Sequence, residues 1–428
     1  MGHASSVGLW LMSEWDVDVE RYEREAASPD RNVRARVAMW SDTPEWLVRQ
    51  LAEDDDYTVR SAVARREVLP EDLILKLARD RDSSVRAALV PPDPAKNPPG
   101  SILHRENPYF PQEALRILAA DEDWLVRRFA AADSRLPQNL IRQLARDEES
   151  VRKGVAENHS APADVLISLA HDSDKGVREA LTENPSTPSD ALRVLADDPD
   201  IDMRFAVAKH LNTPPDALRA LAKDRYTTPV EGAAGNPNTP GDVLRTLLRM
   251  DQVYIPECAA NNPNLPFDVI ADLLSRLDEI KYSIAKAVVR NISAPPATLM
   301  RLAREGNEVA IHNIHQNPAA TSAVLDVLAD SDDWSVRANT ARHVNLPVST
   351  LARLATDEDS KVRGEVSWNR NATGDMLTHL VSHESAAVRL RVAKHPNTHL
   401  ADLITLSNDE DADVKQYAEW GRDEKLGF

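Results

Sequence analysis

The chain has 428 residues, of which 42% are hydrophobic and 5% aromatic, and it contains 13 glycines, 28 prolines and a single cysteine. Its formal net charge of −18, from 51 basic and 69 acidic residues, argues against broad contact with nucleic acid or an anionic membrane, because such contact needs basic surface. Cys258 has no partner for an internal disulfide, and the short apolar run at residues 7–12 has neither the basic flank of a signal peptide nor the length of a membrane span, so a cytoplasmic protein is expected.

Residues 1–22 precede the repeats that fill most of the chain. They carry Trp10, Leu11 and Trp15, which we expect to cover the open face of the first repeat, because the terminal repeats of a solenoid need a cap. We therefore assign residues 1–22 to an N-terminal cap, 23–420 to a single repeat solenoid and 421–428 to a C-terminal tail.

Each repeat is predicted to contain two short helices, as residues 184–209 illustrate. Helix A opens at Thr187-Pro188, where the Thr hydroxyl is expected to cap free backbone N–H groups and Pro fits the first helical position. Leu192 and Leu195 then recur at helical spacing. The acidic turn that follows ends helix A and starts helix B, and the acids in such turns are expected to cap helices.

The first residue of a recurring Val-Arg pair marks each repeat, and we call it the reference position. It falls at Val33, Val59, Val85, Val126, Val151, Val177, Met203, Pro229, Ile255, Ile284, Ala310, Val336, Val362, Val388 and Val414. The usual separation is 26 residues, as between Val33 and Val59. Periodicity of this kind predicts an all-α solenoid of about 15 two-helix repeats, in which each repeat buries its apolar face against its neighbours.

A proline-rich insertion at residues 91–105 interrupts this spacing between the third and fourth repeats. So many prolines exclude a helix, so the segment is interpreted as a surface loop. Insertions in repeat arrays map to loops on one face, often the binding face. Two interpretations of the insertion are kept: a surface loop that is merely tolerated, and a loop with a function.

The arginine after the reference position is expected to form a ladder between neighbouring repeats. Arg178 and Arg204 are expected to pair with the acids at residues 172–174 or 197–200. This role is structural, and each exposed pair should add little to the free energy of unfolding.

Four consecutive repeats, the eighth to the eleventh, lack this arginine. Their residues at that position are Val230, Pro256, Ala285 and Ile311. Pro229 and Pro256 are expected to shorten their B helices. The loss has four alternative interpretations for residues 229–317: repeat decay, a bend, a loosened segment or a ligand site.

The motif Asn-Pro-x-Thr-Pro-x-x-x-Leu-x-x-Leu-Ala-x-Asp-x-Asp-x-x-Val-Arg-x-Ala-Val-Ala resembles the leucine-rich repeat variant (LRV) family, and its Asp-x-Asp-x-x-Val-Arg half resembles HEAT-type α-solenoids. The LRV resemblance implies a right-handed superhelix of short helices without a sheet, in a family whose members are mostly of unassigned function. The founding type adds a cysteine-rich iron–sulfur segment. This chain departs from it, because Cys258 alone cannot hold a cluster, and no cofactor is expected.

The sequence carries no recognisable catalytic motif: nucleophile motifs, glycine-rich phosphate loops and metalloprotease helix motifs are all missing, so no catalytic residue is assigned. His379 and His383 lie four residues apart and His312 and His315 three apart, which are spacings that metal ligands use on helices. Such pairs more often lie on an ordinary surface, and no metal site is assigned. Cys258 is interpreted as a packed core residue.

A stripe of basic and aromatic residues is expected on the outward side of helix B, which lines the concave side in HEAT-like solenoids. Six residues after the reference position, from the tenth repeat on, lie Arg290, Gln316, Arg342, Trp368, Lys394 and Trp420. The residues two after it, also expected to face outward, are Lys286, His312, Ala338, Gly364, Leu390 and Gln416. Because Trp and Arg are enriched at binding hot spots, the predicted partner-binding residues are Arg290, Arg342, Trp368 and Lys394, whereas Trp420 belongs either to the stripe or to a C-terminal cap.

These observations predict a non-enzymatic scaffold that binds another protein, or an acidic peptide segment, along its concave face and away from membranes. The alternative is a nucleic-acid-binding protein resembling the HEAT-like alkylpurine DNA glycosylases, with single-stranded bases stacking on Trp as a related possibility. That alternative requires a continuous basic groove.

Overall fold

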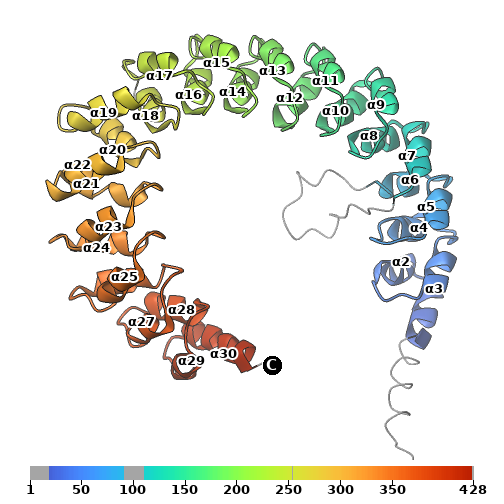
Figure 1. Cartoon of the computed structure of the whole chain (residues 1–428). Coiled ribbons are helices and arrows are strands. Elements are labelled where there is room, and N and C mark those ends of the chain that lie inside the picture. The colour runs from blue at the N-terminus through green and yellow to red at the C-terminus, as the bar shows by residue number, and fades with distance from the viewer. Residues whose placement is uncertain (1–18, 91–109, 253, 427–428) are drawn as a thin grey trace, which may run out of the picture. The chain divides into compact units, whose positions relative to one another are not determined.

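The computed structural model describes residues 19–90, 110–252 and 254–426. Every regular element in these ranges is a helix (Figure 1), which confirms the predicted all-α class. The insertion at 91–105 and residues 1–18 of the predicted N-terminal cap lie outside the described residues. Residues 19–22 belong to a helix that continues to residue 26.

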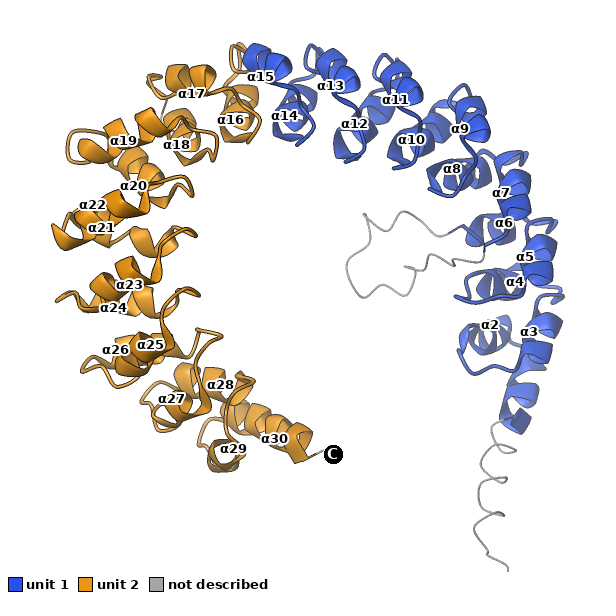
Figure 2. Ribbon diagram, viewed as in Figure 1, with its two compact units in different colours: residues 1–221 blue, residues 222–428 orange. Residues whose placement is uncertain are grey.

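The chain divides into two compact units, residues 1–221 and 222–428 (Figure 2). Unit 1 contains the helix at 19–26, α2 (Arg31–Met39), α3 (Glu45–Leu51), α4 (Tyr57–Ala64), α5 (Glu71–Leu77), α6 (Ser83–Ala88), α7 (Gln112–Ala119), α8 (Trp124–Ala132), α9 (Gln138–Leu144), α10 (Glu149–Glu157), α11 (Ala163–Leu169), α12 (Lys175–Glu183), α13 (Ser189–Leu195), α14 (Ile201–Lys209) and α15 (Pro215–Leu221).

Unit 2 contains α16 (Thr227–Gly235), α17 (Gly241–Leu247), α18 (Tyr254–Asn261), α19 (Phe267–Ser275), α20 (Tyr282–Arg290), α21 (Pro296–Arg304), α22 (Glu308–Ile311), the 3-10 helix η2 (Ile314–Gln316), α23 (Ser322–Ala329), α24 (Trp334–Ala341), α25 (Val348–Leu354), α26 (Ser360–Val366), α27 (Gly374–Thr378), α28 (Ala386–Lys394), α29 (Leu400–Leu406) and α30 (Ala412–Leu426). The last helix runs to Leu426, so residues 421–426 of the predicted tail continue it.

The helices form two layers within each unit. Each of the fifteen reference positions lies on a helix B, and these are the even-numbered helices from α2 to α30. Helix B of one repeat packs on helix B of the next, as α8 does on α10 and α10 on α12, and A helices pack likewise, as α11 does on α13. Leu192 and Leu195 of α13 and Val207 of α14 are buried between the layers. The predicted two-helix repeat is therefore confirmed.

Helix A begins after a proline, but the adjacent threonine does not cap it as expected. Pro188 is the N-cap residue of α13, and its carbonyl accepts the backbone N–H of Leu192. Thr187 lies one residue too early to reach the free N–H groups. Its buried hydroxyl instead donates to the carbonyl of Leu181 at 2.6 Å, near the C-terminal end of α12. The hydroxyl thus satisfies a carbonyl at the end of the preceding helix, where intrahelical donors run out.

Many B helices begin directly after the last aspartate of the acidic turn. The Asp56 side chain accepts the backbone N–H of Thr58 at 2.8 Å at the start of α4. The aspartates that cap B helices in this way include Asp30, Asp56, Asp82, Asp123, Asp174, Asp200, Asp333, Asp359 and Asp411. The predicted capping role of the turn acids is confirmed at these positions.

The prolines of the eighth and ninth repeats do not shorten their helices. Pro229 and Pro256 are each the third residue of a B helix, α16 with nine residues and α18 with eight. Proline fits there because the N–H groups of the first turn have no intrahelical partner. The short helix B is instead α22, with four residues and no proline.

Candidate binding surface on the B helices of unit 2

The ladder arginines are engaged within the fold. The Nε of Arg178 donates to Asp198 Oδ2 at 2.6 Å, and its Nη1 donates to the carbonyl of Asp172 at 2.9 Å. Equivalent pairs join Arg34 to Asp54, Arg60 to Asp80, Arg86 to Asp121, Arg127 to Asp147, Arg152 to Asp172, Arg337 to Asp357 and Arg389 to Asp409. The predicted ladder is confirmed for Arg178, and many of its side chains are more buried than expected. Arg60 and Asp80, for example, are 5% and 9% exposed.

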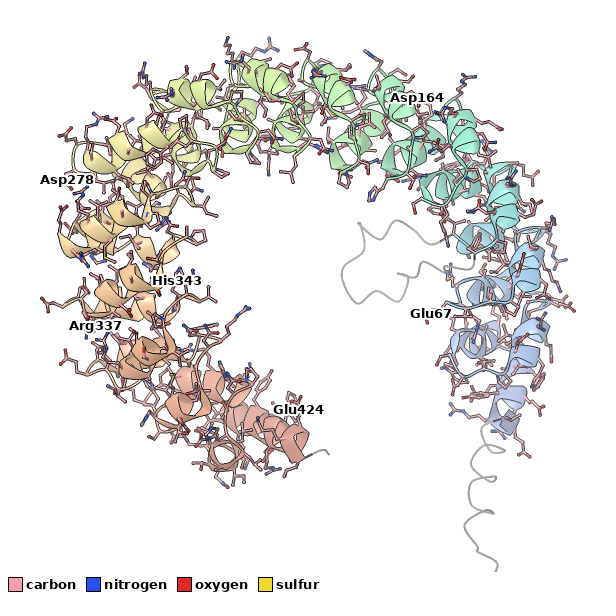
Figure 3. All side chains as sticks on the ribbon, viewed as in Figure 1. Glu67, Asp164, Asp278, Arg337, His343 and Glu424 are labelled. Carbon is pink, nitrogen blue, oxygen red and sulfur yellow. The ribbon has the colours of Figure 1, made fainter. Side chains whose placement is uncertain are left out.

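A second ladder, not predicted from the sequence, runs along the ends of the B helices. Asn184 is buried, and its Nδ2 donates to the carbonyls of Ala156 and Asn158 in the preceding repeat, at 2.8 and 3.1 Å. The residues that bond in this way are Asn158, Asn184, Asn262, Asn291, Asn317 and Asn369, and the same position holds His210, His343 and His395. The recurrence of Asn seven residues after the reference position was the sequence signal. Figure 3 labels Arg337 and His343, which represent the two ladders in one repeat of unit 2.

Arg342 and Trp368, two of the predicted binding residues, lie together. Arg342 follows α24, and its Nε donates to a carboxylate oxygen of Glu365 on α26. Its guanidinium carbon is 5.9 Å from the centroid of the Trp368 ring. The Trp368 side chain is 58% exposed, although its neighbours Ser367 and Asn369 are buried. A cation and a large exposed ring thus meet on the surface at the ends of two adjacent B helices.

A second cation, Arg391 on α28, also lies over Trp368. Its guanidinium carbon is 4.7 Å from the ring centroid, and its Nε donates to Ser367 Oγ at 2.9 Å. Burial lowers the pKa of Arg391. Arg391 was not among the predicted binding residues because helical spacing places the position three after the reference position in the core, whereas the side chain is half-buried.

Lys394 continues the surface into the last repeat. Its Nζ is 3.7 Å from the ring centroid of Tyr417 on α30. Tyr417 in turn packs edge-on against Trp420, with ring centroids 5.0 Å apart and an interplanar angle of 79°. Trp420 remains 56% exposed. The four side chains Arg342, Trp368, Lys394 and Trp420 all project from the predicted position into solvent.

Arg290 does not share this exposure. It is half-buried, and its Nε and Nη2 donate to Asn313 Oδ1 at 3.1 and 2.7 Å. Burial lowers the pKa of Arg290. The pKa of nearby His315 is lowered to about 4, mainly by burial and next by the positive charge of Arg290. Arg290 is thus turned toward the fold.

The second predicted row, two residues after the reference position, does not face outward in the twelfth and thirteenth repeats. Ala338 and Gly364 are buried. A Cβ atom on Gly364 would lie 3.0 Å from Val388 Cγ2 of the next B helix. The B helix α26 packs on α24 at one flank and meets Val388 of α28 at the other, so positions such as Gly364 are covered. From the twelfth repeat on, the residues six after the reference position are exposed, whereas Arg391 is half-buried.

His383 and His312, one from each histidine pair, contact other groups of the fold. His383 Nε2 donates to the carbonyl of Ser360 at 2.9 Å, and its Nδ1 accepts the backbone N–H of Ser385. His312 Nε2 lies 3.6 Å from an oxygen of Asp333. Within the three described ranges no group of three or more His, Cys, Asp or Glu side chains is arranged to hold a metal ion. Cys258 is half-buried rather than core, and burial raises the pKa of its thiol.

Unit 1 carries a hollow of a different character between α12 and α14, with a volume of about 360 Å³. Its charged lining residues include Lys175, Glu179, Asp202 and Lys209, so both signs are present. Lys209 lies over the Phe205 ring at 5.2 Å. This hollow lacks the excess of cations that marks the surface in unit 2. No helix in the described part of the chain is long and apolar enough to cross a membrane.

Comparisons with known proteins bear on the repeat. The model of the "Leucine rich repeat variant" family matches residues 176–200, which confirms the resemblance predicted from the sequence for that stretch. No curated protein matches the chain.

Solved structures similar to the chain include a leucine-rich repeat variant with a novel repetitive structural motif, at 24% identity over 55% of this chain and 87% of that one, with a TM-score of 0.40. A chain from a complex of Kap95p with RanGDP matches at 13% identity over 94% and 60%, with a TM-score of 0.32. A chain from a complex of Kap121p with RanGTP matches at 14% identity over 96% and 48%, with a TM-score of 0.28.

Proposed function

We propose that this helical-repeat protein is a non-enzymatic scaffold that binds another polypeptide through the B-helix surface of unit 2. The observation that carries the proposal is the exposure of Trp368 and Trp420, 58% and 56%, beside the cations of Arg342 and Lys394. Leaving large rings in water forgoes the free energy that burial would provide, and such rings concentrate at binding hot spots. We name Arg342, Trp368, Lys394 and Arg290 as the binding residues, with half-buried Arg290 at the margin.

The charge pattern supports a polypeptide partner with acidic side chains over a nucleic acid. The chain carries a net charge of −18, and the ladder arginines are paired with aspartates, so they add little to a continuous basic groove. Phosphate backbones need many free cations along their length, whereas a peptide needs only a few cations at fixed positions. The basic and aromatic residues of the surface are few and clustered.

The test is a pull-down from lysate of the source cell with the full chain as bait, with and without nuclease. The test variant is Arg342→Glu/Trp368→Ala. The matched control is Lys361→Glu/Trp334→Ala, which removes a similar pair from the other end of α24, where Lys361 Nζ lies 4.3 Å from the Trp334 ring centroid and Trp334 is 42% exposed.

A protein that survives nuclease, is retained by the control and is lost with the test variant supports the proposal. A partner that both variants retain equally would overturn the assignment of this surface. Bound nucleic acid that disappears with nuclease would favour the nucleic-acid alternative.

A further inference from the structure

Arg391 differs from the ladder arginines in what surrounds its guanidinium. The paired ladder arginines face an aspartate of the next repeat, as Arg389, two residues earlier on α28, faces Asp409 at 2.7 Å. Arg391 points to the other side of that helix. Its Nε donates to a neutral hydroxyl, Ser367 Oγ, and its plane lies near the Trp368 ring. Among the described residues, no carboxylate forms an ion pair with it.

Two guanidinium groups, those of Arg342 and Arg391, lie near a single carboxylate, that of Glu365. Glu365 accepts a hydrogen bond from Arg342 and is 22% exposed, and its charge also acts on Arg391 from a greater distance. Arg342 and Arg391 repel each other there. With Glu365 committed to Arg342, the group keeps one net positive charge, and Lys394 lies on the same helix as Arg391. The charge that would complete this arrangement is a second carboxylate.

The position of Arg391 prepares it for such a ligand. The Ser367 bond and the Trp368 ring hold the guanidinium in place, so little side-chain freedom remains to be lost on binding. A fixed guanidinium presents two parallel N–H groups to a carboxylate, a geometry that the ammonium of Lys cannot reproduce. Half-burial strengthens the attraction, because fewer water molecules screen it. The exposed face of Trp368 offers contact area for an apolar neighbour of the bound acid.

We propose that Arg391 and Trp368 form a subsite for the carboxylate side chain of an acidic peptide, with Arg391 binding the carboxylate and Trp368 packing against an apolar residue next to it. Lys394 with Tyr417 and Trp420, in the next repeat, forms a second contact of the same kind for the same peptide. This inference rests on the proposed scaffold function and specifies the chemistry of its partner.

The test uses the full chain and a displayed library of random 12-residue peptides, so that the partner need not be known. Selected peptides are synthesised with a fluorescein label, and their dissociation constants are measured by anisotropy. We expect enrichment of Asp or Glu beside an aromatic or large aliphatic residue. A fluorescein-labelled 20-nucleotide oligothymidylate is titrated in parallel.

The decisive variant is Arg391→Gln, which removes the charge and keeps an amide donor. We expect it to weaken the selected peptides roughly tenfold or more, as the loss of a charged hydrogen bond does, and Arg391→Lys to recover only part of this. Arg370→Gln is the matched control, because it removes an equal charge from an exposed residue two positions after Trp368. The affinity of this variant for the selected peptides should stay unchanged. Trp368→Ala should also weaken binding while Arg391 is retained. Melting curves verify that each variant folds, and if Arg391→Gln melts early, Arg391→Lys and Trp368→Ala decide the outcome.

The outcomes separate the two proposals. Selected peptides without acidic enrichment, or acidic peptides whose affinity Arg391→Gln leaves unchanged, would overturn the subsite and leave the scaffold function intact. A library that yields no binder would overturn both. Tight, Arg391-dependent binding of the oligothymidylate with no peptide binding would replace the acidic peptide with nucleic acid.

Discussion

Asn184 and His210 occupy equivalent positions in neighbouring repeats and make equivalent bonds with different side chains. Asn184 Oδ1 accepts the backbone N–H of Ser186 at 2.9 Å, and His210 Nδ1 accepts that of Asn212 at 3.0 Å. On the other side, His210 Nε2 donates to the carbonyl of Asn184 at 3.0 Å. Because Nδ1 accepts an N–H, the proton of this neutral ring lies on Nε2. The position requires a donor and an acceptor in fixed directions, and both residue types supply them.

Asn184→Ala should destabilise the protein much more than Asn184→His. The alanine variant leaves the Ala156 carbonyl without its donor and the backbone N–H of Ser186 without its acceptor, which costs roughly 1–3 kcal/mol for each unsatisfied group. It also removes one of the two bonds to the Asn158 carbonyl, which keeps the N–H of Ala161. The histidine variant restores the bond to Asn158 and the one to Ser186, as His210 does one repeat later. Urea unfolding followed by circular dichroism measures the difference as a shift in midpoint. Equal midpoints for the two variants would show that these bonds contribute little.

At the scale of the element, one guanidinium connects the turns that precede two successive B helices. Arg60 on α4 donates to Asp80 before α6 at 2.7 Å, and its Nη1 donates to the carbonyls of Asp54 and Asp55 before α4. A buried pair of this kind has a large desolvation cost, so its main effect is to make the loss of either partner costly. Val230 and Met250 occupy the two corresponding positions in the eighth and ninth repeats, where both charges are replaced together.

Arg60→Met should lower the free energy of unfolding by roughly 3–5 kcal/mol, because it leaves the carboxylate of Asp80 buried without its partner. The double variant Arg60→Met/Asp80→Leu should recover much of that loss, since two apolar side chains replace both charges. A double-mutant cycle from chemical denaturation at pH 7 gives the coupling energy. A coupling energy near zero would mean that the ladder is held by its carbonyl bonds alone.

The helix starts were predictable from the sequence because they depend on local chemistry. Pro188 and Asp56 act within two or four residues of themselves, and the 26-residue period carries that chemistry along the chain. Interactions between repeats were harder to predict from the sequence. The sequence gives the spacing of Thr187 from both helices but not the side to which its hydroxyl turns. Arg391 was missed for a related reason, since its exposure depends on the B helices that flank α28 and not on helical period alone.

At the scale of the molecule, the ladder is unevenly distributed. Unit 1 carries a series of pairs that begins with Arg34–Asp54 and includes Arg178–Asp198, whereas the B helices α16 to α22 of unit 2 have Val230, Pro256, Ala285 and Ile311 at the arginine position.

The ladder also lowers the pKa of its aspartates. Burial alone would raise the pKa of Asp80, but the hydrogen bonds from Arg60 and from the backbone N–H of Asp82 lower it below 3.8. The pKa of Asp172 is lowered in the same way, with Arg152 as the partner.

These lowered pKa values predict that acid loosens the ladder repeats of unit 1 before the repeats that lack a ladder. As the pH falls, the unfolded chain takes up these protons before the folded chain does, so the contribution of each pair is complete above about pH 4–5 and is lost as the pH falls through the lowered pKa. Hydrogen exchange, with samples equilibrated between pH 6 and 3 and labelled in a short pulse at one fixed pH, should show protection lost first over α4 to α12. The segment from α16 to α20 should respond less. Simultaneous loss in both segments would point instead to net charge, because protonating the 69 acids leaves 51 basic residues to repel one another throughout the chain.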